Sequence, residues 1–133
     1  MSDRKMSKAD FEMLANFRYQ LRRFLRFSEE LTRGSGITSL QYQLMLQVKG
    51  FPGRDWATVG ELAERLQAQQ HGVVSLISRS ESGGLVERNA SASDKRRVEV
   101  RLTPKGEKLL ERLARLHRVE LRSLPDLTAF SAN

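Results

Sequence analysis

The spacing of apolar residues between Thr58 and Gly106 restricts this chain to few folds, because the period of the pattern changes along the stretch. From about Val59 to Leu66, and again from Val73 to Ile77, apolar residues recur three and four positions apart, which is typical of one face of a helix. Gly83 and Gly84 then break the helical pattern. The stretch therefore predicts two short helices that are followed by a segment of different structure.

The first of these helices has a start signal and the second has a polar face. Thr58 precedes the apolar run and Glu61 follows three residues later, which is the capping-box arrangement at a helix N-terminus. The polar face of the second helix carries side chains that can hydrogen-bond base edges and phosphates in a DNA major groove. Its candidate DNA-binding residues are Gln69, Gln70, His71, Ser75 and Arg79. A plain solvated surface is the alternative, because every amphipathic helix has a polar face.

The segment after the second helix predicts a β-ribbon with a basic tip. Leu85 to Arg88 can form a first strand. Val98, Val100 and Leu102 alternate with charged residues, as expected of a second strand with one buried face. The connecting loop, 89–96, is longer than a tight hairpin needs and ends in cations. Two helices followed by such a ribbon have the order of a winged helix-turn-helix, so we predict a mainly α fold with a small β-wing.

Three blocks of the sequence resemble the MarR family of transcriptional regulators. The run from Asp94 to Gly106 is similar to the family's wing pattern, which is D-x-R, alternating apolar residues and then L-T-x-x-G. Leu62 to Leu66 and Gly84 to Arg88 also resemble the family, at the expected spacing. The resemblance implies that Arg96 reaches into a minor groove while Asp94 holds it in place.

The resemblance extends over roughly Leu31 to Leu113, and the sequence departs from the family pattern within the second short helix. Gln69 stands where the family usually has a serine cap, and Gly72 and Ser80 replace a better helix former and a core leucine. With the neighbouring cations included, the candidate DNA-binding residues of the wing are Asp94, Lys95, Arg96 and Arg97.

Two long helices are expected on either side of this region, from about Ser7 to Thr32 and from Pro104 to Leu124. Their apolar faces are larger than one small subunit can cover, and exposed apolar patches of that size usually mark an interface. We therefore predict a homodimer with two-fold symmetry. The predicted interface residues are Leu14, Phe17, Leu21, Leu110, Leu113 and Leu121.

We expect the whole chain, 1–133, to form a single domain. In it, segments 7–33 and 104–133 are the dimerisation helices, and segment 38–103 is the DNA-binding lobe. Pro125 should end the last helix, which leaves a C-terminus that is short for the family or has been cut. Trp56, just before the first short helix, is expected to be a core or hinge-packing residue rather than a platform for a ligand.

Composition excludes several classes of function. The net charge of +7 and the pI near 10.4 favour a polyanionic partner such as double-stranded DNA. The absence of cysteine excludes disulfides, thiolate zinc sites and thiol redox sensing. No apolar run approaches the roughly 18 residues that a membrane span needs, and the N-terminus lacks the apolar core of a signal peptide. We therefore expect a cytoplasmic protein without a membrane partner.

The sequence thus predicts a homodimeric DNA-binding regulator, expected to repress a promoter through a pseudo-palindromic operator. The resemblance also implies release by a small aromatic or anionic effector, although no ligand-binding residue can be assigned. A winged-helix module that binds protein instead of DNA is the alternative. An enzyme is disfavoured, because His71 and His117 are the only histidines and neither has a catalytic partner at motif spacing. No cofactor or metal is expected.

Overall fold

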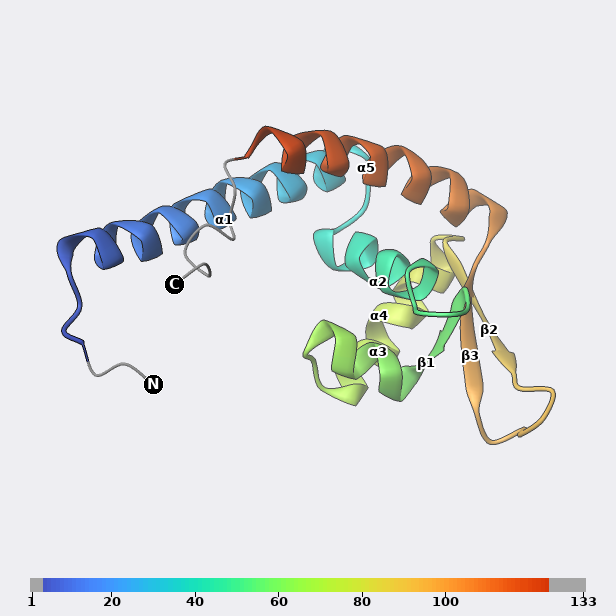
Figure 1. Cartoon of the computed structure of the whole chain (residues 1–133). Helices are drawn as coiled ribbons and strands as arrows, with labels where there is room; N and C mark the ends of the chain where they lie inside the picture. The colour runs from blue at the N-terminus through green and yellow to red at the C-terminus, as the bar shows by residue number, and fades with distance from the viewer. Residues whose placement is uncertain (1–3, 125–133) are drawn as a thin grey trace.

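The computed structural model describes residues 4–124 and confirms the predicted fold class, which is mainly helical with a small antiparallel sheet (Figure 1). In chain order the elements are α1 (Lys8–Gly34), α2 (Ser39–Lys49), β1 (Trp56–Thr58), α3 (Val59–Leu66), α4 (Gln70–Ser82), β2 (Val86–Ala90), β3 (Val98–Leu102) and α5 (Pro104–Ser123). The lobe from α2 to β3 is the winged helix-turn-helix, and α1 and α5 lie outside it.

Within residues 4–124, four of the five helices begin with a side-chain cap. Ser7, Thr38 and Thr58 each form a capping box at the start of α1, α2 and α3, with the side chain of the residue three positions later. The Thr103 side chain accepts a hydrogen bond from a backbone N–H in the first turn of α5. Gln69 occupies the N-cap position of α4, and its side chain makes no capping hydrogen bond. This agrees with the absence of the family's serine at that position.

The sheet joins the wing to the helices. Among the described residues its strand order is β1-β3-β2, and both pairings are antiparallel. Strand β2 pairs with β3 from Val86↔Leu102 to Ala90↔Val98, so it runs two residues further than the sequence indicated. Strand β1 pairs Trp56 with Arg101. The sequence pattern gave no sign of β1, because three residues are too few to show an alternation.

The core lies where α2, α3, α4 and the sheet meet, and α5 closes it. Its side chains are apolar and almost fully buried: Tyr42, Leu44, Met45, Val48, Ala57, Leu62, Val73, Leu76, Ile77, Leu85, Val86, Val100, Leu110 and Leu113. The last two residues differ from expectation, since Leu110 and Leu113 were predicted to face a second subunit. In one chain they are already covered by the lobe, and they anchor α5 to it.

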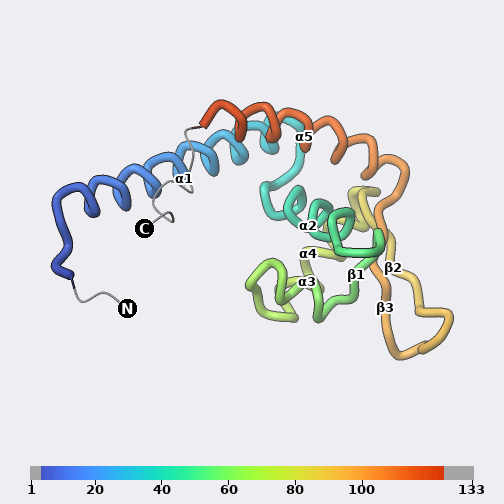
Figure 2. The backbone as a smooth tube through the Cα atoms, in the orientation of Figure 1, coloured from blue at the N-terminus to red at the C-terminus, as the bar shows by residue number. Residues whose placement is uncertain are grey.

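Helices α1 and α5 pack against each other outside the lobe, and the N-terminal part of α1 extends beyond it (Figures 1 and 2). We call this pair of helices the arch. Residues 4–124 contain no helix that combines the length and the apolar character of a membrane span. The arch meets α2 at His117 of α5, which is buried and hydrogen-bonds Ser28 of α1. His117 also stacks on Tyr42 of α2, so this side chain contacts both the arch and the lobe.

Candidate nucleic-acid interface

The predicted reading residues lie on the open side of α4. Val73, Leu76 and Ile77 face the core, and this leaves the opposite side of the helix exposed. All five candidate residues on this helix are exposed: Gln69, Gln70, His71, Ser75 and Arg79. Helix α3 packs against the inner side of α4, and Gln67 makes the turn between them in the left-handed region, with φ of 52°. This is the arrangement in which a second helix can enter a major groove.

Val74 is an exposed residue of α4 that the sequence prediction missed. Its side chain is 42% exposed, and it lies next to Ser75 on the open side of the helix. An apolar group in this position can contact the methyl group of thymine. The signal was present in the sequence, because the buried positions 73, 76, 77 and 80 leave position 74 outside the core.

The wing tip presents Arg96 to solvent. The Arg96 side chain is 93% exposed, and its Nε lies 3.4 Å from Oδ1 of Asp94. The same Asp94 oxygen accepts a hydrogen bond from the Arg96 backbone N–H at 3.0 Å, which is the geometry of an Asx turn. Asp94 therefore fixes the backbone from which Arg96 extends, while the guanidinium group keeps most of its hydrogen-bonding capacity.

Ser91 is a buried residue whose hydrogen bonds hold the shape of the wing tip, and the sequence prediction missed it as well. Its side chain is buried, and its Oγ accepts hydrogen bonds from the backbone N–H groups of Ser93 and Asp94, each at 3.3 Å. The backbone N–H of Ser91 donates to the carbonyl of Arg97 at 2.9 Å. A loop of small polar residues thus has internal hydrogen bonds that shape it. A serine that precedes such a turn is the signal that could have indicated this role.

Arg97 lies apart from the other wing cations. Its guanidinium group is 3.6 Å from Glu99 and 5.2 Å from the centre of the Trp56 ring. Lys95 and Arg96 are both exposed at the tip. The structure therefore brings Asp94, Lys95 and Arg96 together, and it places the Arg97 side chain against Ser91, Glu99 and Trp56.

Ion pairs reduce the number of cations available to a polyanion. Arg88 pairs with Glu81 at 2.8 Å, and hydrogen bonds from Arg88 hold the pKa of Glu81 below its usual value. Lys105 donates to the carbonyl of Gly83 at 3.0 Å, at the junction of α4 and the wing. Arg96 at the wing tip also has an ion-pair partner, Asp94, but its side chain stays 93% exposed.

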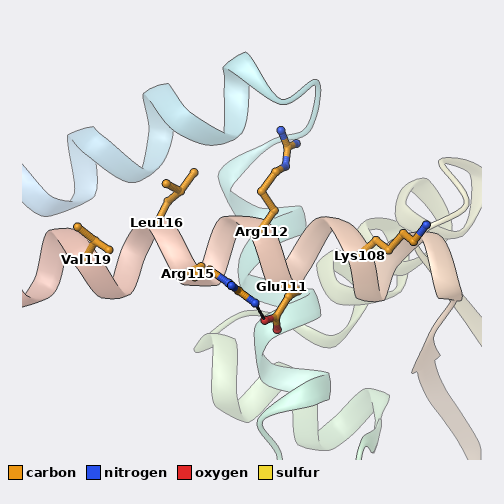
Figure 3. A pocket seen from close by; sticks show the side chains of 6 residues that line it. All are labelled: Lys108, Glu111, Arg112, Arg115, Leu116 and Val119. Carbon is orange, nitrogen blue, oxygen red and sulfur yellow. Dashed lines mark hydrogen bonds and ion pairs between the residues drawn. The ribbon is translucent and has the colours of Figure 1, made fainter.

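The arch has an apolar surface of its own. Its exposed apolar side chains are Phe11, Leu14, Tyr19, Leu25, Leu116, Val119 and Leu121, whereas Phe17 and Leu21 are half-buried. A groove of about 440 Å³ runs along one face of α5 (Figure 3). It is lined by Lys108, Glu111, Arg112, Arg115, Leu116 and Val119. Leu116 and Val119 are exposed, whereas Leu110 and Leu113 of the same helix are buried in the core.

The two histidines do not form a catalytic or metal site together. His71 is exposed on α4, and His117 is buried beneath α1. Within residues 4–124, no cluster of three or more histidine, aspartate or glutamate side chains is arranged to hold a metal ion.

Comparison with known proteins identifies the architecture. The sequence pattern of the MarR family matches residues 35–97, from the end of α1 to the wing loop. A protein of Thauera aromatica described as a putative transcriptional regulatory protein for the hcr operon is 27% identical over 112 residues. That alignment covers 84% of this chain and 64% of the relative, so the chain spans less than two thirds of that protein.

Solved structures share the fold over nearly the whole chain. AbsC, a MarR family transcriptional regulator from Streptomyces coelicolor, superposes with a TM-score of 0.77 at 19% identity, covering 97% of this chain and 90% of AbsC. The F27L mutant of MepR from S. aureus, solved bound to an oligodeoxyribonucleotide, gives a TM-score of 0.66 at 20% identity, covering 96% of this chain and 91% of MepR.

Proposed function

This chain belongs to the MarR family of transcriptional regulators, and we propose that it acts as a homodimeric repressor that binds double-stranded DNA. The observation that carries the proposal is the exposure of Arg96 at a wing tip held by hydrogen bonds, together with an α4 whose polar face is open. In Figure 1 the wing extends from the side of the lobe that faces away from the arch, so the arch does not cover it.

In this proposal each structural part has one role in binding. Helix α4 enters the major groove, where Gln70, His71, Ser75 and Arg79 reach base edges, and a good bidentate contact discriminates by about 1–3 kcal/mol. The wing reaches the adjacent minor groove with Arg96. Minor grooves attract inserted arginines, most strongly where A-tracts narrow them. The charge of +7 supports binding at physiological salt.

Dimerisation through the arch would place two DNA-binding lobes, one from each subunit, on one duplex. The support for it is the exposed apolar side chains of α1 and α5, which a second copy would cover. Because Leu110 and Leu113 belong to the chain's own core, the α5 part of the proposed interface is Leu116, Val119 and Leu121. Two lobes related by two-fold symmetry would fit half-sites about one helical turn apart.

Light scattering tests the dimer. The unaltered protein should have twice the mass of the 15.2 kDa chain. Leu116→Glu combined with Val119→Glu should give a folded monomer, because two charges would have to be buried in the interface. A monomeric unaltered protein would contradict the dimer.

Release of DNA by a small aromatic or anionic effector is part of the same proposal. The supporting observation is that one buried side chain, His117 of α5, contacts both Ser28 of α1 and Tyr42 of α2 where the arch joins the lobe. A ligand that changes the angle at this joint would change the distance between the two DNA-binding lobes, and only differential affinity for the two arrangements could shift their populations.

A gel-shift experiment tests the DNA-binding proposal. The purified protein is titrated against the DNA upstream of its own gene, with unrelated competitor duplex at moderate salt. We expect a retarded complex that excess competitor does not remove. Equal displacement by any duplex would count against sequence-specific regulation.

A further inference from the structure

We propose that Trp56 is a positioning residue that holds the wing at a fixed angle to the α3–α4 unit. This inference rests on the proposed DNA-binding function for its biological meaning, since it determines where the wing meets the minor groove when α4 lies in the major groove. The geometry on which it depends is independent of DNA.

Trp56 stands in the middle of a stack of rings and guanidinium groups. The Arg54 guanidinium lies between two rings, 4.2 Å from the centre of Phe51 and 3.9 Å from the centre of Trp56. From the wing, Arg97 and Arg101 also approach the Trp56 ring, at 5.2 and 5.8 Å. Guanidinium groups within about 6 Å of an aromatic centroid are attracted to the ring. One indole ring thus contacts a cation from the segment before β1 and two cations from the wing.

Carboxylates fix the cations at each end of the stack. On the helix side, Arg54 pairs with Glu61, whose other oxygen accepts the backbone N–H of Thr58 at 2.9 Å and so caps α3. On the wing side, Glu99 is only 12% exposed and pairs with both Arg97 and Arg101, at 3.6 and 3.2 Å. The first turn of α3 is therefore linked to β3 through Trp56.

The backbone connection between the same two parts is short. Strand β1 has three residues, and its pairing with β3 ends at Thr58↔Glu99. Arg97 lies two residues beyond that pair, towards the wing tip, and yet it contacts the Trp56 ring. The ring thus supports a part of the ribbon that no β1 hydrogen bond reaches. Without the ring, the outer wing would be free to move and would lose conformational freedom when it bound DNA.

The test measures the wing position directly. The chain has no cysteine, so Ala68→Cys in the α3–α4 turn and Ala92→Cys in the wing provide two unique sites for spin labels. Labelled protein is diluted with unlabelled protein so that only distances within one chain are measured. We expect a narrow distance distribution in the parent, a broad one after Trp56→Leu, and a narrow one again after Trp56→Phe, which restores a flat ring.

Phe51→Leu is the matched control. It removes a ring from the same stack, but Phe51 contacts Arg54 and Arg65 and is not among the contacts of the wing arginines. Its distribution should stay narrow. If Trp56→Leu did not fold, as judged by circular dichroism, the pair Arg97→Gln and Arg101→Gln would remove the wing cations with the indole in place, and it should broaden the distribution in the same way.

An unchanged distribution in folded Trp56→Leu protein, or equal broadening in Phe51→Leu, would overturn the inference. Neither result depends on DNA, so both are distinct from failure of the gel-shift. On a preferred duplex, Trp56→Leu should also weaken binding by roughly three- to tenfold with the major-groove base preference retained. Loss of base preference along with affinity would contradict a role confined to the wing.

Discussion

The imidazole ring of His117 stacks on the phenol ring of Tyr42, with ring centroids 4.2 Å apart and ring planes 9° apart. Nδ1 lies 2.7 Å from the carbonyl of Leu113 and Nε2 lies 2.8 Å from the hydroxyl of Ser28. Because a carbonyl only accepts, Nδ1 carries the proton, and in the neutral ring Nε2 accepts from Ser28. One side chain therefore connects α5 with α1 and α2, and burial of the Tyr42 phenol raises its pKa.

Two substitutions that remove contacts of His117 should lower the stability of the protein by different amounts. Ser28→Ala deletes one buried hydrogen bond and should lower the free energy of unfolding by about 1 kcal/mol. His117→Ala also leaves a cavity beside Tyr42 and should cost about 3 kcal/mol. Urea unfolding followed by circular dichroism measures both. Arg118→Ala, at an exposed neighbouring position, is the control and should change stability by less than about 0.5 kcal/mol. Equal effects of the three changes would show that His117 is not a joint.

Acid should remove the contribution of Glu61 to stability. Burial acts to raise the pKa of Glu61, but the hydrogen bonds from the Thr58 backbone and the Arg54 side chain outweigh it, and the net pKa is lowered. A carboxyl whose pKa is lower in the folded state stabilises above its unfolded pKa, which is about 4.3, and loses that effect as the pH falls through the folded value. Unfolding of the parent and of Glu61→Gln, compared from pH 7 to pH 3, should therefore converge at the acid end. A constant difference would contradict this.

Replacing glycine by alanine should raise the stability of the protein at position 72 and lower it at position 106. A Cβ at Gly72 would meet nothing within 4 Å, so Gly72→Ala should stabilise α4 by up to about 1 kcal/mol. A Cβ at Gly106 would lie 2.1 Å from the carbonyl oxygen of Leu85, so Gly106→Ala should destabilise by about 1–3 kcal/mol. Thermal unfolding of the two variants measures both signs. This contact also explains the glycine of the L-T-x-x-G pattern.

Asp94 and Arg96 should both support DNA binding, although their charges are opposite. Arg96→Ala should weaken binding to specific and unrelated duplexes alike, and lower the magnitude of the salt slope by about one. Asp94→Ala should also weaken binding, because the Arg96 backbone loses its hydrogen-bond acceptor. Fluorescence anisotropy over a salt series measures affinity and slope.

Glu87→Ala is the control for charge in that experiment. Glu87 is an exposed carboxylate of β2, and its removal should leave binding unchanged or make it slightly tighter. If folded Asp94→Ala protein bound DNA more tightly than the parent, then Asp94 would act only through its negative charge.

The fold could be predicted largely from local chemistry. Apolar spacing and the Thr58–Glu61 capping box predicted α3 with its observed ends, and the alternation from Val98 to Leu102 predicted β3. These features depend on near neighbours in the sequence. The Asp94–Arg96 contact has the same character, because its partners are only two positions apart in the sequence.

Features that depend on packing between distant segments could not be predicted. On the broad apolar face of α5, spacing does not distinguish a residue that faces its own core, such as Leu113, from one that faces outwards, such as Val119. Trp56 was expected to be a core or hinge-packing residue. Its contacts with Arg97 and Arg101 could not be predicted, because they depend on the pairing of β1 with β3.

The central claim is that two copies of this chain read one duplex through α4 and the wing. Selection of bound duplexes from a random library, at moderate salt with the unaltered protein, tests it most directly. The account predicts enrichment of an inverted repeat whose half-sites have centres about 10–10.5 base pairs, or a multiple of that, apart. Recovery of duplexes with no shared sequence, or of a single half-site without a repeat, would contradict it.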